Sequence, residues 1–474
     1  MVVQHNLQAM NANRMLNITT GSQSKSAEKL SSGYRINRAA DDAAGLSISE
    51  KMRKQIRGLD QASTNAEDGV SAVQTAEGAL TEVHSMLQRM NELAVQASNG
   101  TNSISDRQAI QDEISQLNTE IDRVAETTKF NETYLLKGGD GTKEVTMNGH
   151  DAGLKGSLAD GATKATFSIE AGALDAGKKI TIGGKEYTIG AEAKDGQALV
   201  TAQEKTGGKI TVNGKNYTYN DTDSKWLDSE GNDAKVGNGA NAGEIKIADG
   251  DKVSDGSKTL TVMVDAKKAD GTAGKDKIDD TDSSVITADK AIELMQAELE
   301  AANKIGVDDP ASVTVSKPTY DKTKATEFEI TKGTAKVADR LSFNLHVGSD
   351  ADMTNKIGVN IETMNSAYLG IKGLNVADDS GNAATYAIDA IADAVAKVSE
   401  QRSALGAVQN RLEHTIDNLD NVVENTTSAE SRIRDTDMAE EMVNYSKNSI
   451  LQQAGQSMLA QANQANQGVL SLLQ

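Results

Sequence analysis

An apolar residue recurs at every third or fourth position between Gly45 and Ala97. One register of this pattern comprises Met52, Leu59, Ala66, Val73, Leu80, Leu87 and Ala94, and the other comprises Ala62, Ala76, Val83, Met90 and Ala97. The spacing predicts a single α-helix with one continuous apolar stripe, which at about 1.5 Å per residue forms a rod of roughly 70 Å. Because Gly58, Gly69 and Gly78 weaken an isolated helix, we expect packing against a partner to stabilise this rod.

The two ends of the chain carry apolar faces that have no evident partner. Residues 1–44 are mostly polar, and the apolar positions on their one helical face include Val3, Leu7 and Met10. A second stripe runs almost to the last residue and comprises Val443, Ile450, Ala454, Met458, Ala465, Val469 and Leu472. Such polar segments bury too little surface to fold alone. We therefore expect both ends to be loose until a partner covers these faces.

Two further heptad helices complete the helical part of the chain. The rod ends at Asn99–Gly100, and Ser105 with Gln108 predicts a capping box for the next helix. That helix carries Ile110, Ile114, Leu117, Ile121 and Val124. After Asp389 the heptad pattern returns with Ile391, Val398, Leu405, Leu412 and Leu419. Arg402 and Gln409 interrupt this last pattern, and we place both at a solvated edge of the seam.

The middle of the chain has a different composition, because residues 139–380 hold 29 of the 41 glycines. Short β-branched runs predict strands at 180–182, 210–212, 260–264 and 341–347. The run KITIGGKEYT at 179–188 recurs as KITVNGKNYT at 209–218, which predicts one β-hairpin used twice. One helix is predicted from Ala288 to Ile305. The chain should therefore be a helical rod built from both termini, with a β-rich insertion between them.

Composition and charge narrow the possible partners. The 474 residues carry a formal net charge of −20 and include no cysteine. The negative charge disfavours nucleic acid and anionic membranes, and the lack of cysteine excludes disulfides and thiolate metal sites. The sequence has no signal-peptide core and no run of about 18 apolar residues, so neither Sec-type export nor a membrane span is expected.

Candidate chemistry is also sparse. The five histidines, His5, His84, His150, His346 and His414, lie far apart and none has a metal-binding spacing. The acidic clusters at 249–251 and 279–282 lack the pattern of a calcium loop, so we interpret them as solvated charge. No zinc-protease, serine-nucleophile or phosphate-loop motif occurs. The sequence therefore predicts no enzyme activity, no metal and no cofactor.

Long motifs near both ends of the chain point to a family. The N-terminal motifs are LSSGYRIN at 30–37, DDAAGLSIS at 41–49, QRMNELAVQ at 88–96 and FN at 130–131. The C-terminal motifs are GAVQNRLEH at 406–414, SRIRDTD at 431–437, ILQQA at 450–454 and AQANQ at 460–464. Together they resemble bacterial flagellins, the subunits of the flagellar filament. Motifs of this length and number do not agree by chance.

The resemblance implies a division into three parts. Residues 1–44 and 435–474 correspond to terminal coiled-coil arms, which are disordered in the free subunit and form the filament core. Residues 45–138 and 341–434 correspond to a helical rod domain with a small β-hairpin, and 139–340 to a variable, β-rich outer domain. The implied function is that of a structural subunit that polymerises with itself, through the terminal stripes, into the filament used for swimming.

The resemblance also implies partners and a location. The chain would leave the cell unfolded through the flagellar type III export apparatus and act in the extracellular flagellum. Its partners would include an export chaperone, the filament cap and the hook-junction proteins. Two alternatives stay open, namely a low-copy hook–filament junction protein and a flagellin with an adhesive or enzymatic outer domain.

One motif also matches a receptor epitope of the family. Gln88, Arg89, Leu93 and Gln96, together with Glu113 on the next helix, match the flagellin epitope for the innate immune receptor TLR5. The same residues are equally expected to contact neighbouring subunits in a filament. Leu93 falls outside both heptad registers, so we expect its side chain to be exposed.

Overall fold

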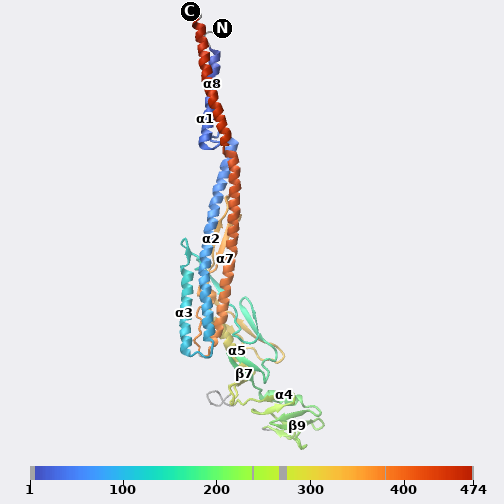
Figure 1. The fold of residues 1–474 in the computed structure, drawn as a ribbon. Coiled ribbons are helices and arrows are strands. Elements are labelled where there is room, and N and C mark those ends of the chain that lie inside the picture. The colour runs from blue at the N-terminus through green and yellow to red at the C-terminus, as the bar shows by residue number, and fades with distance from the viewer. Residues whose placement is uncertain (1–5, 238–239, 266–274, 379, 472–474) are drawn as a thin grey trace. The chain divides into compact units, whose positions relative to one another are not determined.

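The computed structural model describes residues 6–237, 240–265, 275–378 and 380–471. The chain divides into two compact units, and each contains segments from both halves of the sequence (Figure 1). Unit 1 comprises Met1–Val73, Phe343–Val359 and Gly406–Gln474, and unit 2 comprises Gln74–Ser342 and Asn360–Leu405. This architecture confirms the predicted fold class, with helical termini and a strand-rich middle.

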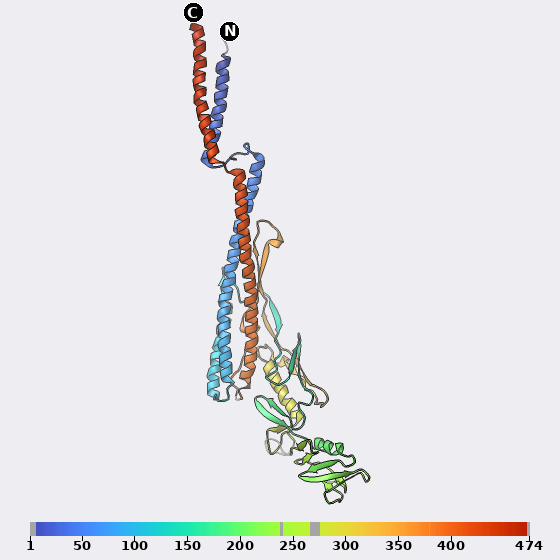
Figure 2. The ribbon, with the colours of Figure 1, turned by 45° about the vertical axis from the view of Figure 1, so that its right-hand side comes forward.

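Unit 1 is built from paired helices. Helices α1 (Leu7–Ser32) and α8 (Met438–Ser471) lie side by side in both views (Figures 1 and 2). The first part of α2 (Ala43–Ala97) packs against the last part of α7 (Asn382–Arg434), where Leu59, Ala62 and Leu419 are buried together. The Ser63 hydroxyl donates a hydrogen bond of 3.2 Å to Asp420 across this pair. The two heptad patterns thus meet as predicted.

A β-hairpin packs against the same helices of unit 1. Strand β19 (Leu341–His346) pairs antiparallel with β20 (Lys356–Ile361), and the 3-10 helix Met353–Asn355 precedes β20. Leu345 and Ile357 pack with Ala66 and Leu412. A Cβ atom added at Gly69 would collide with the end of the Leu345 side chain. Glycine at this point of α2 therefore lets Leu345 pack against the helix without shifting its side chain, despite the cost of glycine to helix stability.

Unit 2 contains the rest of α2 and α7 together with α3 (Ile104–Thr127). The N-cap of α3 is Ser103, whose capping-box partner is Asp106. The predicted capping box at Ser105 and Gln108 was wrong, because it is the Asp106 carboxylate that accepts a hydrogen bond from the Ser103 backbone amide. Arg402 of α7 lies 3.5 Å from Glu77 of α2, at a partly exposed edge of the helix pair.

Polar side chains of α3 hold an extended segment, residues 366–378, along one side of that helix. We call Arg107, Gln111, Asn118 and Asp122 the polar ladder. Asp122 accepts from Ser366, and Asn118 donates to the Ile371 carbonyl. Gln111 bonds to the Leu374 carbonyl and the Val376 amide, and Arg107 donates to the Asp378 carbonyl. The only regular element of this segment is the short helix α6 (Ser366–Leu369). The side chains of the polar ladder therefore satisfy backbone groups that a neighbouring strand would otherwise pair with.

The insertion in unit 2 consists of small sheets with two helices, α4 (Ala193–Ala202) and α5 (Ala288–Asn303). The largest sheet has the order β10 (Lys225–Leu227), β9 (Lys215–Asn220), β8 (Lys209–Val212), β13 (Lys252–Ser254) and β14 (Thr259–Thr261). A four-stranded sheet has the order β16 (Thr314–Val315), β17 (Thr326–Thr331), β5 (Lys164–Ile169) and β4 (Ser157–Asp160). A three-stranded sheet has the order β15 (Val285–Ile286), β7 (Lys185–Ile189) and β6 (Lys179–Ile182).

Three strand pairs complete unit 2. They are β1 (Lys129–Phe130) with β2 (Thr133–Tyr134), β3 (Thr142–Thr146) with β18 (Thr334–Ala338), and the parallel pair β11 (Lys235–Val236) with β12 (Glu244–Ile245). The 3-10 helix Pro310–Ser312 lies between α5 and β16.

The internal repeat folds as predicted. In the first hairpin Lys179 pairs with Thr188, and in the second Lys209 pairs with Thr218, so the two copies have the same register. Both two-residue turns have positive φ angles. The helix predicted at 288–305 is present as α5, whereas α4 was not predicted.

Glu298 on α5 gives the insertion a predictable pH dependence. Its carboxylate accepts a hydrogen bond from the Tyr386 hydroxyl on α7, and burial together with the Asp378 charge raises the pKa of Glu298. The folded state therefore holds this proton more tightly than the unfolded chain, and the free energy of unfolding falls as the pH rises above about 4.5. We expect Glu298→Gln to remove this fall and to stabilise unit 2 at neutral pH, measured by chemical denaturation between pH 4 and 8.

Glu293 on the same helix provides the control. Lys290 lowers the pKa of Glu293, so its contribution to stability is present above pH 4.5 and is lost as the pH falls. Glu293→Gln should therefore change the pH profile in the opposite direction. Equal profiles for the two variants would contradict the assignment.

Candidate assembly surface on the terminal helices

Helices α1 and α8 meet largely through small and polar side chains, together with Leu16 of α1. A Cβ atom added at Gly455 of α8 would lie 3.3 Å from the side chain of Leu16 on α1. The Asn6 amide donates a hydrogen bond of 3.1 Å to the Ala462 carbonyl. Asn6 also caps α1, because its side chain accepts from the Ala9 amide. Glycine at position 455 therefore lets α8 approach the Leu16 side chain closely.

The large apolar side chains of α1 and α8 are exposed. Among the described residues, 16 large hydrophobic side chains are exposed, and ten of them belong to these two helices. The ten are Leu7, Met10, Met15, Ile18, Met438, Met442, Val443, Ile450, Leu451 and Met458. Their exposed fractions run from 47% at Leu451 to 70% at Leu7. A concentration of exposed apolar residues of this kind marks a surface that a partner covers.

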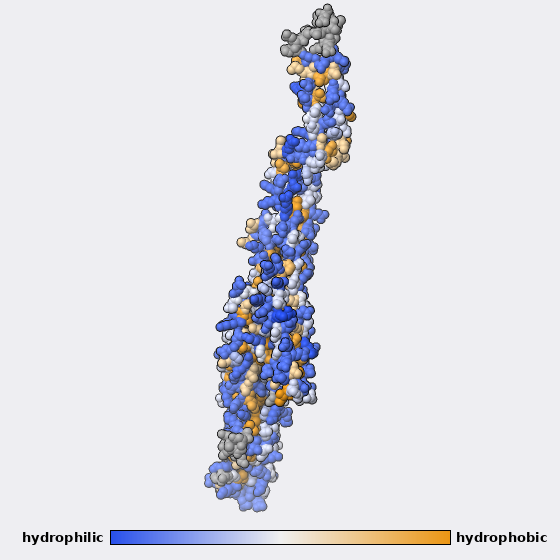
Figure 3. Space-filling model, turned by 90° about the vertical axis from the view of Figure 1, so that its left-hand side faces the viewer, coloured by the Kyte–Doolittle hydropathy of each residue, from blue (hydrophilic) through white to orange (hydrophobic). Residues whose placement is uncertain are grey.

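A groove of about 620 Å³ lies between α1 and α8 on this surface. Its lining comprises Gln8, Asn11, Ala12, Met15, Gly455, Met458, Gln461 and Ala462. Figure 3 shows hydrophobic residues between hydrophilic ones on the side of the terminal helices that it presents. The two methionines and the small residues Ala12, Gly455 and Ala462 make part of the groove apolar, and Gln8, Asn11 and Gln461 add side-chain amides. This mixture suits a side chain of mixed character from another helix.

The predicted assembly residues fall into two groups. Leu7, Met10, Val443, Ile450, Ala454 and Met458 are all exposed on the paired helices. Val3 and Leu472, and the side chains of Ala465 and Val469, lie outside the described residues. Sequence reasoning missed Met15 and Met442, although each is an apolar residue on an otherwise polar helix. That these helices become ordered only on assembly stays a prediction.

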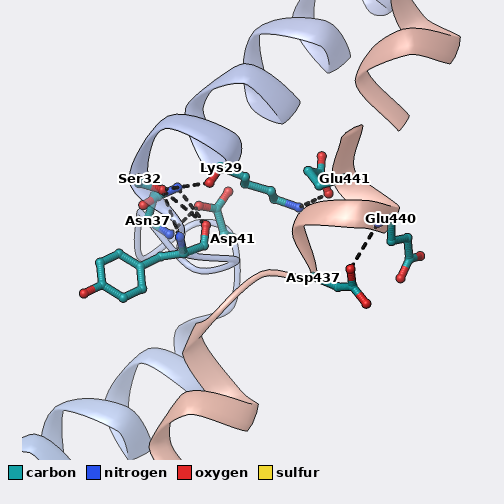
Figure 4. A network of polar contacts seen from close by, with 8 residues as sticks. Lys29, Ser32, Asn37, Asp41, Asp437, Glu440 and Glu441 are labelled. Atoms are coloured by element: carbon teal, nitrogen blue, oxygen red, sulfur yellow. Dashed lines mark hydrogen bonds and ion pairs between the residues drawn. The ribbon is translucent and has the colours of Figure 1, made fainter. Parts of the chain in front are cut away.

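The breaks between α1 and α2 and between α7 and α8 lie next to each other. A network of polar contacts surrounds them (Figure 4). Tyr34 and Asp435 form an isolated antiparallel β-bridge, and Lys29 of α1 lies 3.8 Å from Glu441 of α8. Asp41 accepts hydrogen bonds from the backbone amides of Asn37 and Arg38, which lower the pKa of its carboxyl. The periodicity of apolar residues does not indicate this network, because its contacts are polar and join segments that are far apart in the sequence.

The residues that match the receptor epitope lie on α2 and α3 in unit 2. Gln88, Arg89, Gln96 and Glu113 are exposed, and Arg89 Nε donates to Glu113 at 2.9 Å. The Glu113 hydrogen bond is also the main cause of a raised pKa at Arg89. The surface therefore presents an exposed arginine, paired with Glu113 and Glu92, between two glutamines.

Leu93 differs from the prediction, because its side chain is 2% exposed. In unit 2, α2 contacts α3 through Arg89 and α7 through Glu77. A helix with neighbours on two sides buries a wider face than the two registers of a heptad seam. Leu93 is therefore a core residue and not an exposed anchor.

No other site stands out in the described part of the chain. It contains no group of three or more histidine, aspartate or glutamate side chains that is placed to hold a metal ion. None of its helices combines the length and the apolar character that a membrane span requires.

Comparisons with known proteins give the family. Residues 3–140 match the bacterial flagellin N-terminal helical region, and residues 388–473 match the bacterial flagellin C-terminal helical region. A flagellin of Clostridium tyrobutyricum is 39% identical over 98% of this chain and its own full length. A flagellin of Bacillus subtilis is 36% identical, with 100% of both chains covered. The solved structure of FliC from Burkholderia pseudomallei covers 72% of this chain and 99% of its own, with 19% identity and a TM-score of 0.28.

These relatives extend over the whole chain, including the inserted region where no motif was recognised. The family is structural and has no catalytic role, which agrees with the absence of a catalytic motif in the sequence. With both terminal regions matched and full-length relatives above 30% identity, the chain belongs to the bacterial flagellin family and is a structural subunit of the flagellar filament.

Proposed function

We propose that this flagellin polymerises by burying the exposed apolar faces of α1 and α8 against neighbouring subunits. The observation that carries the proposal is the gathering of ten exposed large hydrophobic side chains on these two helices. Burial of apolar surface contributes about 25 cal/mol per Å², and a helical polymer repeats the contact at every subunit. The arms thus provide the driving force for growth of the filament used in swimming.

Seeded polymerisation combined with limited proteolysis tests this proposal. Arg14, Lys25 and Lys447 are tryptic sites within the two arms. We expect rapid cleavage at these sites in the dilute monomer and protection in filaments grown on seeds, because only neighbours cover the apolar faces. Arms that resist trypsin in the dilute monomer would contradict it. A chain that never grows on filament seeds would favour the low-copy hook–filament junction protein.

We further propose that the chain is secreted unfolded through the flagellar type III apparatus and acts in the extracellular flagellum. An export chaperone, the filament cap and the hook-junction proteins are its proposed partners. The family supports this route, and a chain without cysteine forms no disulfide that would obstruct it. Loss of the protein from the culture medium in cells without the export apparatus is the expected result, and undiminished secretion would exclude the route.

Recognition by TLR5 is a second proposed function, favoured by the exposed Arg89–Glu113 pair between Gln88 and Gln96. Arginines at interface centres commonly contribute more than about 1.4 kcal/mol, which is tenfold in affinity. We expect Arg89→Ala to weaken binding to the receptor ectodomain at least about tenfold, measured by surface plasmon resonance. The monomer's stability should change by less than about 1 kcal/mol, because the ion pair is exposed.

Arg57→Ala is the matched control, since Arg57 is an exposed arginine on the same helix in unit 1. Equal binding by the two variants would remove Arg89 from the receptor surface. Leu93 is unsuitable for this test, because a substitution there disturbs the core.

A further inference from the structure

The two helix breaks of unit 1 are joined by backbone hydrogen bonds. Helix α1 ends at Ser32 and α2 begins at Ala43, whereas α7 ends at Arg434 and α8 begins at Met438. The Arg35 amide donates to the Arg434 carbonyl at 2.7 Å, and the Thr436 amide donates to the Gly33 carbonyl at 3.0 Å. With the bridge between Tyr34 and Asp435, these bonds make a minimal two-stranded ladder. Both arms therefore leave the rod through one shared piece of structure.

Side chains reinforce the same junction. The Arg35 guanidinium donates to the carbonyls of Arg432 and Ile433, which are among the last of α7 and lack intrahelical partners. Arg434 forms an ion pair of 2.6 Å with Glu50 and lies 5.1 Å from the centre of the Tyr34 ring. Every one of these contacts joins a residue before position 51 to a residue after position 431.

The loop between α1 and α2 is itself well packed. Ile36 is 1% exposed, and Asp42 accepts a hydrogen bond of 2.9 Å from the Gly45 amide at the start of α2. The loop therefore holds a defined shape and presents Tyr34 and Arg35 to the other break. It does not behave as a free linker between two helices.

We propose that these paired breaks form a latch, comprising residues 33–36 and 432–436, that makes order in one arm depend on order in the other. Because each latch bond has one partner on either side, displacement of one arm removes bonds from both. A closed latch fixes the direction in which α1 ends and the direction in which α8 starts, which brings their facing sides together. Subunit addition would close the latch, and a closed latch would favour subunit addition. This last step rests on the proposed polymerisation.

A disulfide across the bridge tests the latch directly. The chain has no cysteine of its own, so Tyr34→Cys with Asp435→Cys yields one possible disulfide. Cα atoms of bridged strand residues lie about 4.5 to 5.5 Å apart, within the range that a disulfide spans. We expect amide hydrogen exchange in residues 16–32 and 438–459 of the oxidised monomer to be at least about tenfold slower than in the reduced form of the same variant. Equal exchange in the two forms, or slowing in only one arm, would overturn the proposal.

A charge-matched pair of variants tests the latch in growth. Arg35→Gln removes the bonds to the end of α7, whereas Arg38→Gln removes the same charge from a residue whose partner, Glu28, lies within α1. We expect Arg35→Gln to slow seeded growth at least about tenfold and Arg38→Gln to grow as the unmodified chain does. Introducing the oxidised disulfide into Arg35→Gln should restore growth.

The outcomes separate the two proposals. Failure of the unmodified chain to grow on seeds counts against the proposed polymerisation. Normal growth of Arg35→Gln, or no rescue by the disulfide, overturns the latch while leaving polymerisation intact. Circular dichroism of each variant measures the helix content of the rod. This content should stay unchanged, because none of the substituted residues belongs to the buried contacts between α2 and α7.

Discussion

Replacing Ile450 or Met458 with glutamate should abolish filament growth while leaving the melting temperature of the monomer unchanged. Both side chains are exposed in the single chain, at 66% and 61%, so a charge there stays solvated before assembly. Burial of an unpaired carboxylate against a neighbour costs several kcal/mol. Every subunit of the polymer would carry that penalty. Light scattering of seeded growth, with circular dichroism of the monomer, measures both effects.

Gln456→Glu is the control for this prediction. Gln456 is exposed on the same helix and lies about 240° around it from Ile450, away from the side that carries Ile450 and Met458. Its glutamate variant should grow at nearly the normal rate, because the new charge can remain hydrated. Normal growth of the Ile450 and Met458 variants, or an unfolded monomer, would show that the assembly surface has been misplaced.

Arg107→Ala should destabilise unit 2 by about 3 kcal/mol or more. Arg107 is 4% exposed, and its guanidinium donates hydrogen bonds of 3.0 Å to the carbonyls of Ala97 and Asp378. Truncation leaves the two carbonyls without this donor and opens a cavity, and each lost buried hydrogen bond costs about 1 to 3 kcal/mol. Chemical denaturation followed by circular dichroism gives the free energy, and hydrogen exchange should show that residues 374–378 loosen first.

Arg123→Ala isolates the effect of burial on the same helix. Arg123 pairs with Glu120 of α3 at 2.5 Å, and its side chain is 60% exposed. An exposed ion pair contributes at most about 1 kcal/mol, so this variant should be close to neutral. Equal losses from the two arginine variants would contradict a structural role of the polar ladder at Arg107.

The elements that were predicted from the sequence are those whose apolar residues repeat. Heptads located α2, α3 and α7, because a seam between long helices needs an apolar residue at every turn. The duplicated ten-residue run predicted the register of two hairpins, because a turn of two residues determines which residues of the two strands pair. The exposed stripe of α8 was also predictable, because Ile450, Ala454 and Met458 recur at a helical spacing in a run rich in glutamine, asparagine and alanine.

The features that were missed lack such a repeat. Helix α4 has ten residues with an internal glycine, Gly196, which weakens any periodic signal. Residues 366–378 are held by Gln111 and Asn118, and sequence reasoning does not reveal which carbonyls distant amides will meet. Leu93 was misplaced because two registers describe a helix with one neighbour, and α2 has two in unit 2. The latch joins residues about 400 positions apart through polar bonds that have no pattern along the chain.

The distance along the sequence between the two halves of the rod has a consequence for biosynthesis. Ser63 and Asp420 are neighbours across the seam, yet they are 357 positions apart. At about 5 to 20 residues per second, a ribosome needs roughly 20 to 70 s to travel between them. During that time Leu59 and Ala62 have no Leu419 to cover them. The seam between α2 and α7 therefore cannot form until translation is nearly complete.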